Sequence, residues 1–285
     1  MCDPPGHEPR TETPGGPLPA QHEPNPSAAG VQKIRLRYAK RGRLRFTSHR
    51  DVARAFERAL RRAGVPMAYS QGYNPHPKIS WVGAAPTGVA SEAEYVEISL
   101  IRFLDAALVG AEIDKALPPG LDIVDAVTSA GGSLPERMHA SRWEITVDGV
   151  GPELLADAVA RFMAADAVGV QRLTKDGRRE LDARTPVISM RVSSGASENP
   201  GGCGILDAVV RQVSPAVRPD DVMSALRIVA GLEPPVPVRA LRVAQGPLDD
   251  DGVLGDPLAA DREAGPSGPG DPPRRGPDVV ATGTA

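Results

Sequence analysis

The chain shows two kinds of hydrophobic spacing, and each predicts a different element. Apolar and basic residues alternate over residues 33–38, which predicts a strand with one apolar and one basic face. Leu44 and Phe46 alternate with arginines in the same way, which predicts a second short strand beside it. Apolar residues recur every three or four positions over residues 49–63, and this spacing predicts an amphipathic helix.

Strand and helix patterns then follow in an order that is repeated. Residues 32–130 read as strand, helix, two strands, helix and strand, and residues 140–240 give a similar order with an extra hairpin. The glycines at 131–132 mark the join. We therefore predict an α+β protein of two tandem ferredoxin-like modules, of the βαββαβ type.

Both ends of the chain differ from this folded part in composition. Residues 1–30 and 246–285 hold 27 of the 60 Gly and Pro residues and few large apolar side chains. Such segments bury too little apolar area to offset about 1–2 kcal/mol of backbone entropy per ordered residue. We expect disordered tails over residues 1–31 and 246–285, the second of them acidic.

Charge is distributed unevenly along a chain whose net charge is only −3. Residues 32–65 carry twelve Lys and Arg against two acids, whereas residues 246–285 carry eight acids against three arginines. An ordinary solvated surface intersperses both signs, so this excess favours a polyanionic partner, although a plain solubilising surface is the alternative. The predicted nucleic-acid contacts are Lys33, Arg35, Arg37, Arg43, Arg45, Arg50, Arg54, Arg58 and Arg61.

Two histidines are weak candidates for catalysis. His49 lies next to Ser48 and close to Asp51, and His76 lies between two prolines that stiffen its loop. Either could act as a general base, but the commoner role of a single histidine in such a loop is to cap a turn. No second catalytic group accompanies either of them at a recognisable spacing.

Four runs of sequence resemble a known bacterial family. They are FTSHRD (46–51), FERALRRAGVP (56–66), YSQGYNPHPKI (69–79) and GVASE (88–92). The family is linked to radical S-adenosylmethionine enzymes and was catalogued as domain of unknown function 2344; this chain resembles its stand-alone form. The resemblance is specific over residues 32 to about 127 and weaker to about 240, and Arg50 departs from it, because a hydrophobic residue is more usual there. The third run contains the family-motif loop residues Ser70, Gly72, Asn74, His76 and Lys78.

The resemblance implies a partner or substrate-presenting role. The chain has two Cys and no CxxxCxxC motif, so we expect it to bind neither the iron–sulfur cluster nor S-adenosylmethionine by itself. Both cofactors are expected only on a partner enzyme, and we predict no metal site in this chain.

Three functions remain open. The first is a non-catalytic accessory protein that presents ribosomal or transfer RNA to a radical S-adenosylmethionine enzyme through its basic N-terminal face. The second is an RNA-processing enzyme, similar to a ribonuclease or a pseudouridine synthase, that uses His49 or His76. The third is a scaffold whose basic patch meets an acidic protein. With no run of about 18 apolar residues and no signal-like start, we expect a cytoplasmic protein without membrane contact.

Overall fold

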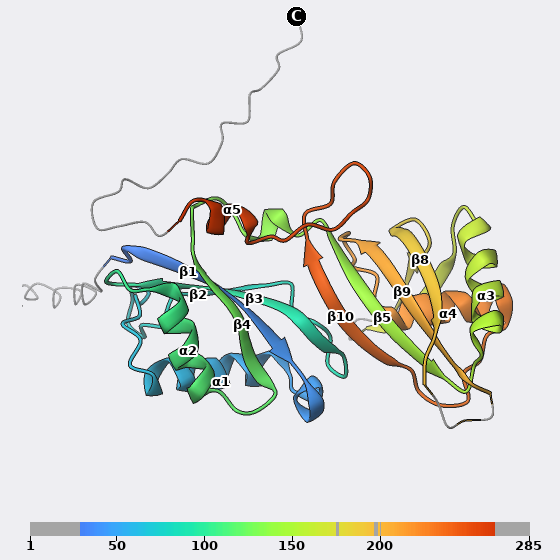
Figure 1. Ribbon diagram of the computed structural model, residues 1–285, viewed down its shortest axis with the longest axis horizontal. Helices are drawn as coiled ribbons and strands as arrows, with labels where there is room; N and C mark the ends of the chain where they lie inside the picture. Colours follow the sequence, from blue (N-terminus) through green and yellow to red (C-terminus); the bar gives the residue numbers. More distant parts are fainter. Residues whose placement is uncertain (1–28, 175–176, 197–198, 200, 266–285) are drawn as a thin grey trace, which may run out of the picture.

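A computed structural model describes residues 29–174, 177–196, 199 and 201–265 (Figure 1). The predicted α+β class is confirmed, because the described chain forms one large mixed sheet with five α-helices. None of these helices is both long and apolar enough to span a membrane. The predicted disordered segment 1–31 falls almost entirely outside the described residues.

The first half of the chain alternates strands and helices as the hydrophobic spacing predicts. The helix expected over residues 49–63 is observed at His49–Arg62. In chain order the elements are β1 (Gln32–Lys40), the 3₁₀ turn η1 (Gly42–Phe46), α1 (His49–Arg62), β2 (Ile79–Val82), β3 (Ala90–Leu100), α2 (Ala106–Ala116) and β4 (Leu121–Thr128).

The second half has the same order of elements with one hairpin inserted. A second 3₁₀ turn, η2 (Pro135–Arg137), links the halves. The elements are β5 (Ala140–Asp148), α3 (Pro152–Ala164), β6 (Gly169–Thr174), β7 (Gly177–Asp182), β8 (Val187–Ser194), β9 (Cys203–Arg211), α4 (Pro219–Ala230), β10 (Arg239–Gly246) and α5 (Ala259–Glu263).

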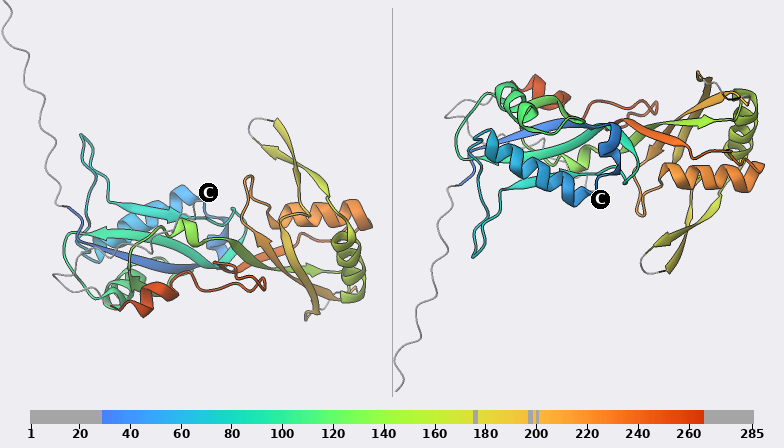
Figure 2. Two further views of the ribbon diagram at one scale, coloured as in Figure 1. Left: turned by 90° about the horizontal axis from the view of Figure 1, so that it is seen from above. Right: turned by 90° about the horizontal axis from the view of Figure 1, so that it is seen from below.

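All strands except the β6–β7 hairpin join a single eight-stranded sheet in the order β4-β1-β3-β10-β5-β9-β8, with β2 also bonded to β3. Within each half the paired strands are antiparallel, and the halves meet where β10 runs parallel to β3 at Ala90 and Ser91. Helices α1 and α2 cover one apolar core and α3 and α4 cover another. Figure 2 shows α1 and α4 on the same side of the molecule, with the loop before β2 and the β6–β7 hairpin projecting from that side.

The predicted second strand at residues 43–46 is wrong. These residues form η1, a single tight turn that begins at Gly42, whose φ of 54° is open to glycine. Arg43 and Arg45 therefore do not extend the basic face of β1. Alternation over only four residues is too short to separate a strand from a turn.

The predicted disorder from residue 246 needs correction for residues 246–265. After β10 the chain returns to the first half, and α5 packs against β4 (Figure 1). Leu258 is fully buried with Tyr95 and Val127, on the sheet face opposite α1. Residues 266–285 lie outside the described residues.

Candidate nucleic-acid interface

Helix α1 separates its apolar and basic residues onto two faces. It begins after Ser48, whose side-chain oxygen accepts a hydrogen bond from the Asp51 backbone N–H at 3.2 Å. Val52, Phe56 and Leu60 are buried against the sheet. Packing of this apolar stripe directs the arginines between them to solvent, as the 3.6-residue period requires.

The arginines of α1 are exposed and almost unneutralised. The Arg54 guanidinium lies 3.6 Å from the Asp51 carboxylate, and this exposed ion pair contributes little free energy. The other acid of the helix, Glu57, forms no ion pair among the described residues. Within that same part of the chain no carboxylate pairs with Arg50, Arg58, Arg61 or Arg62.

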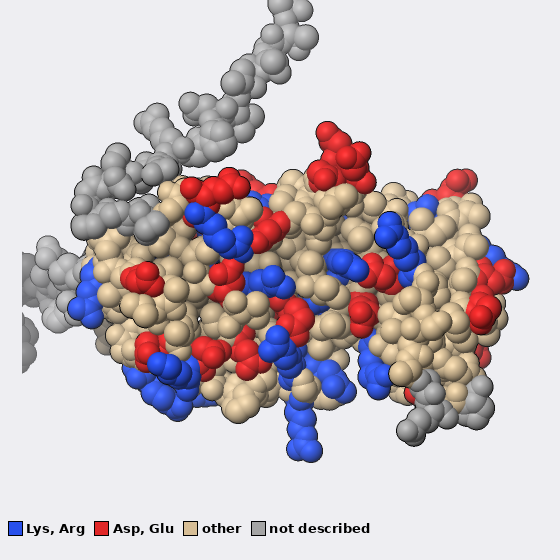
Figure 3. All heavy atoms as spheres, viewed as in Figure 1, with Lys and Arg blue, Asp and Glu red and all other residues tan. Residues whose placement is uncertain are grey.

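Two more cations flank the start of α1 on η1. Arg43 is exposed, and the Arg45 guanidinium lies 4.5 Å from the ring centre of Phe46, which is itself 58 % exposed. Figure 3 shows Lys and Arg atoms along the lower rim of the first half, where Figure 1 places α1 and η1, and Asp and Glu atoms projecting from the upper rim. We call η1 and α1 together the basic surface.

The predicted contacts on β1 do not belong to this surface. Arg35 has no exposed area; its guanidinium donates to Glu97 at 2.9 Å and to Asp261 at 2.8 Å. Lys33 pairs with Glu97 at 2.7 Å, and Arg37 donates to the Glu92 backbone carbonyl at 2.7 Å. These side chains point to the α5 side of the sheet, away from α1. Arg35 is therefore excluded as a direct nucleic-acid contact.

The base of the family-motif loop lies beside the second half of α1. The Ser70 hydroxyl accepts from the His76 backbone N–H at 2.9 Å, and the Ser70 backbone N–H donates to the His76 carbonyl at 2.8 Å, which shapes the loop into a tight turn. A cavity of about 160 Å³ lies between helix and loop, lined by Arg61, Tyr69 and His76 among others. Asn74 and Lys78 are exposed and Gly72 is half-buried.

The same loop exposes aromatic rings that the sequence analysis did not single out. Tyr73 is 98 % exposed and Tyr69 is 42 % exposed. Exposed aromatic side chains beside arginines are the usual stacking platforms for unpaired bases. The available sequence signal was a tyrosine in a Pro- and Gly-rich loop, outside any apolar periodicity.

The two histidines occupy different places. His49 is exposed at the first turn of α1, with its ring 5.2 Å from that of Trp81 in an edge-on arrangement. His76 lies beside Arg61 in the cavity lining. Arg61 is twelve residues after His49 on the helix, which separates the two positions by about 18 Å at 1.5 Å per residue. They therefore do not form one site, and among the described residues no cluster of His, Cys, Asp and Glu could hold a metal ion.

The basic surface and the loop fall within a region that defines a family. A family model described as an uncharacterised protein conserved in bacteria (DUF2344) matches residues 33–219. The chain belongs to this family. The matched DUF2344 region runs from β1 to the first residue of α4, and no curated protein matches the chain.

Solved structures add little to the DUF2344 assignment. The chain is similar to an unknown protein from Galdieria sulphuraria, with 12 % identity over 74 % of this chain and 98 % of that one and a TM-score of 0.23. It is also similar to the encapsulated DyP-type peroxidase from Mycobacterium smegmatis, with 10 % identity over 79 % and 94 % and a TM-score of 0.22. At these scores nothing about this DUF2344 protein follows from either likeness.

Proposed function

We propose that this protein binds RNA through its basic surface and presents it to a radical S-adenosylmethionine enzyme, without carrying out the chemistry itself. The observation that carries the RNA part is a set of exposed arginines on η1 and α1 without carboxylate partners among the described residues. Exposed rings accompany them: Phe46 on η1 and Tyr73 on the family-motif loop. Cations of this kind bind phosphates, and the rings suit unpaired bases.

The enzyme partner is proposed from the sequence resemblance and the cysteine content. Cys203 is buried, and it is the single free cysteine of the described chain. Two cysteines in the sequence cannot supply the three thiolates of a radical-generating cluster. We therefore assign the cluster and S-adenosylmethionine to the partner.

We further propose that the two halves are ferredoxin-like modules fused through one sheet. Two facts support this: each half runs strand, helix, two strands, helix, strand, if the β6–β7 hairpin is set aside as an insertion, and each pairs its strands in the order fourth, first, third, second. Such a sheet has a helix-covered face and an open face. In the first half that second face is covered by residues 247–265.

Reversing two charges on α1 tests the RNA proposal. We expect Arg54→Glu with Arg58→Glu to weaken binding of transfer or ribosomal RNA by about a hundredfold at 0.1 M salt, because phosphate contacts and their released counterions are lost. The slope of log affinity against log salt should decrease by about two. Fluorescence anisotropy with labelled RNA over several salt concentrations measures both quantities.

The matched control is Arg191→Glu with Arg227→Glu, which changes the same charge at exposed positions of the second half. This variant should keep most of the affinity. Equal affinities of the α1 variant and the wild type, or binding that does not depend on salt, would contradict the proposal. Equal melting temperatures of both variants exclude unfolding as the cause.

A product assay separates this proposal from an RNA-processing enzyme. RNA incubated with the purified protein should keep its length on a denaturing gel and its nucleoside composition by mass spectrometry. Cleaved or isomerised RNA whose formation is lost in His49→Ala or His76→Ala would instead establish the enzyme.

A further inference from the structure

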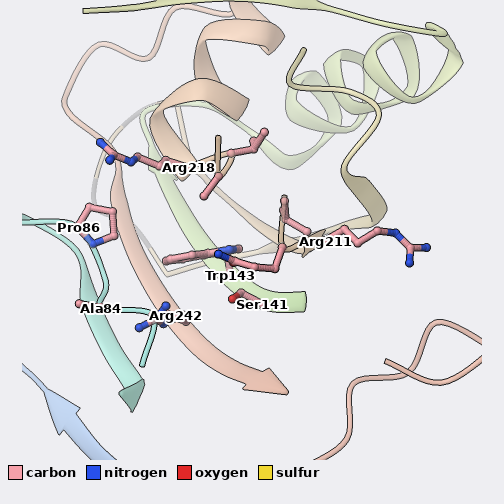
Figure 4. A pocket seen from close by; sticks show the side chains of 12 residues that line it. Ala84, Pro86, Ser141, Trp143, Arg211, Arg218 and Arg242 are labelled. Atoms are coloured by element: carbon pink, nitrogen blue, oxygen red, sulfur yellow. The ribbon is translucent and has the colours of Figure 1, made fainter. Parts of the chain in front are cut away.

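A cavity of about 160 Å³ lies where the two halves of the sheet meet (Figure 4). Its walls come from the segment after β2, from β5, β10 and the end of β9, and from the connection between β9 and α4. The lining residues are Gly83, Ala84, Pro86, Ser141, Trp143, Val210, Arg211, Gln212, Ala216, Val217, Arg218 and Arg242.

Two hydrogen-bond donors of this cavity are unused. Ser141 and Trp143 lie two residues apart on β5, hence on the same sheet face, and are 5 % and 6 % exposed. Within the described ranges, neither the Ser141 hydroxyl nor the Trp143 indole N–H has a hydrogen-bond partner. Among the described residues, Arg184 Nε is the one fully buried side-chain nitrogen or oxygen without a partner. The Ser141 and Trp143 donors therefore keep contact with solvent through the cavity, where a ligand or water can accept from them.

The charges around the cavity favour an anion. Its lining contains three arginines and no carboxylate. Glu94 pairs with Arg242, so this arginine adds no net charge, and Asp221 pairs with Arg172. The positive charge available to an anion is therefore that of exposed Arg218 and Arg211. Figure 4 shows the Arg218 side chain extending towards Pro86 at the rim, whereas the Arg211 guanidinium points away from Trp143.

The cavity is connected to the basic surface through its own rim. The backbone N–H of Gly88, two residues after Pro86, donates to the Arg45 carbonyl of η1 at 2.7 Å. The buried Lys40 ammonium donates to the Pro86 carbonyl at 3.3 Å. A strand of RNA that leaves η1 towards the second half would therefore pass over this rim.

We propose that the junction cavity binds a phosphate group, with Arg218, Ser141 and Trp143 as its donors. Guanidinium, hydroxyl and indole N–H groups all donate to phosphate oxygens, and a cavity without carboxylates does not repel them. The phosphate belongs either to the RNA backbone, in which case the inference rests on the proposed function, or to a free phosphorylated molecule.

The two tryptophans of the chain make a direct test possible. In ¹⁵N-labelled full-length protein, the indole N–H signals of Trp143 and Trp81 are followed during titration with inorganic phosphate, AMP and a short single-stranded RNA. Trp143→Phe assigns the signals. We expect the Trp143 signal to shift with saturation, while Trp81 serves as an internal reference in the phosphate and AMP titrations and sodium chloride at equal ionic strength serves as the blank.

Single changes to the proposed donors supply the controls. Ser141→Ala and Arg218→Gln should each raise the dissociation constant obtained from the Trp143 shift about tenfold, because each removes a hydrogen bond to a charged group. Arg227→Gln, an exposed arginine nearer the other end of α4, should leave it unchanged. An unmoved Trp143 signal with all three probes, or an equal titration in Ser141→Ala with Arg218→Gln, would overturn the proposal.

The three probes also separate the two sources of phosphate. A Trp143 shift on adding RNA supports a backbone phosphate. A shift with AMP and inorganic phosphate but not with RNA supports a site for a free phosphorylated molecule. If the charge reversal on α1 leaves RNA affinity unchanged, the RNA function fails, and a Trp143 response to AMP still supports the cavity.

Discussion

Burial changes the acid–base chemistry of several side chains in the first half. Lys40 lies at the junction of the halves, and burial lowers the pKa of its ammonium, partly opposed by the nearby Glu94 carboxylate. Burial also raises the pKa of Tyr38 well above its ordinary value, an effect that Glu94 reinforces. On the opposite sheet face, burial raises the pKa of Tyr95 to about 12. The two tyrosine shifts lower the stability of the fold at alkaline pH, whereas the Lys40 shift acts in the opposite direction.

Tyr95 provides the clearest pH prediction. The unfolded chain releases this proton near pH 10, whereas the folded chain holds it until about pH 12. The folded state therefore binds more protons between these values, and its stability falls as pH rises through them. Between pH 9 and pH 11, the free energy of unfolding of Tyr95→Phe should therefore decrease by about 1.3 kcal/mol less than that of the wild type.

Urea unfolding at the two pH values measures this difference. Tyr73→Phe is the matched control, because Tyr73 is almost fully exposed. If the wild type and Tyr95→Phe lose the same free energy of unfolding, the raised pKa of Tyr95 is wrong.

At the scale of single elements, the start of α1 depends on one hydroxyl. The Ser48 side chain accepts from the Asp51 N–H and donates to the Asp51 carboxylate at 2.7 Å. Ser48→Ala should lower the free energy of unfolding by about 1 kcal/mol, because the cap is lost. Ser48→Asn, which keeps a capping oxygen, should restore most of it. Thermal or urea unfolding of the three proteins tests this, and an alanine variant as stable as the wild type would exclude the cap.

Elements defined by a long local period were predictable from sequence. The helix at α1 was predicted to within one residue, because its apolar spacing continues over more than three turns. The turn at η1 was missed because four alternating residues also fit a strand. β10 was missed because it is recognised only by its partners β3 and β5, which are distant in sequence.

The candidate site was predicted in part for the same reason. The exposure of the α1 arginines follows from the helix period. The predicted exposure of Lys33, Arg35 and Arg37 required the second face of β1 to be open to solvent. That face is covered by residues about 220 positions later, and Arg35 was predicted exposed because no local pattern reveals Asp261. The junction cavity could not be predicted, because it joins β5, β10 and the 83–86 segment only in the fold.

At the scale of the whole molecule, Asp261 ties the end of the described chain to its beginning. Its carboxylate accepts from Arg35 at 2.8 Å and from Arg137 at 2.7 Å, and its own exposure is 2 %. A buried ion pair adds little compared with an apolar core, but removal of one partner strands the other charge. These ion pairs therefore hold residues 247–265 on the first half, and the loss of one partner alone is costly.

Asp261→Ala should lower the free energy of unfolding by about 3 kcal/mol, because the buried Arg35 guanidinium loses one of its two carboxylates. The control is Asp250→Ala, which removes an exposed acid of the same segment and should change stability by less than about 0.5 kcal/mol. Urea unfolding of both variants measures the difference. A loss for Asp261→Ala no larger than that of the control would show that the ion pairs do not hold the segment.

The path of the chain back over the first half decides how this protein can be divided. A cut near residue 135 would give a leading fragment in which Arg35 keeps Glu97 but loses Asp261, and a trailing fragment with Leu258 uncovered. It would also break the pairing of β3 with β10 at Ala90 and Ser91. We therefore expect that neither fragment is an independent domain. We expect gene fusion or recombination to keep the two halves together as one unit, with new sequence added only outside residues 32–265.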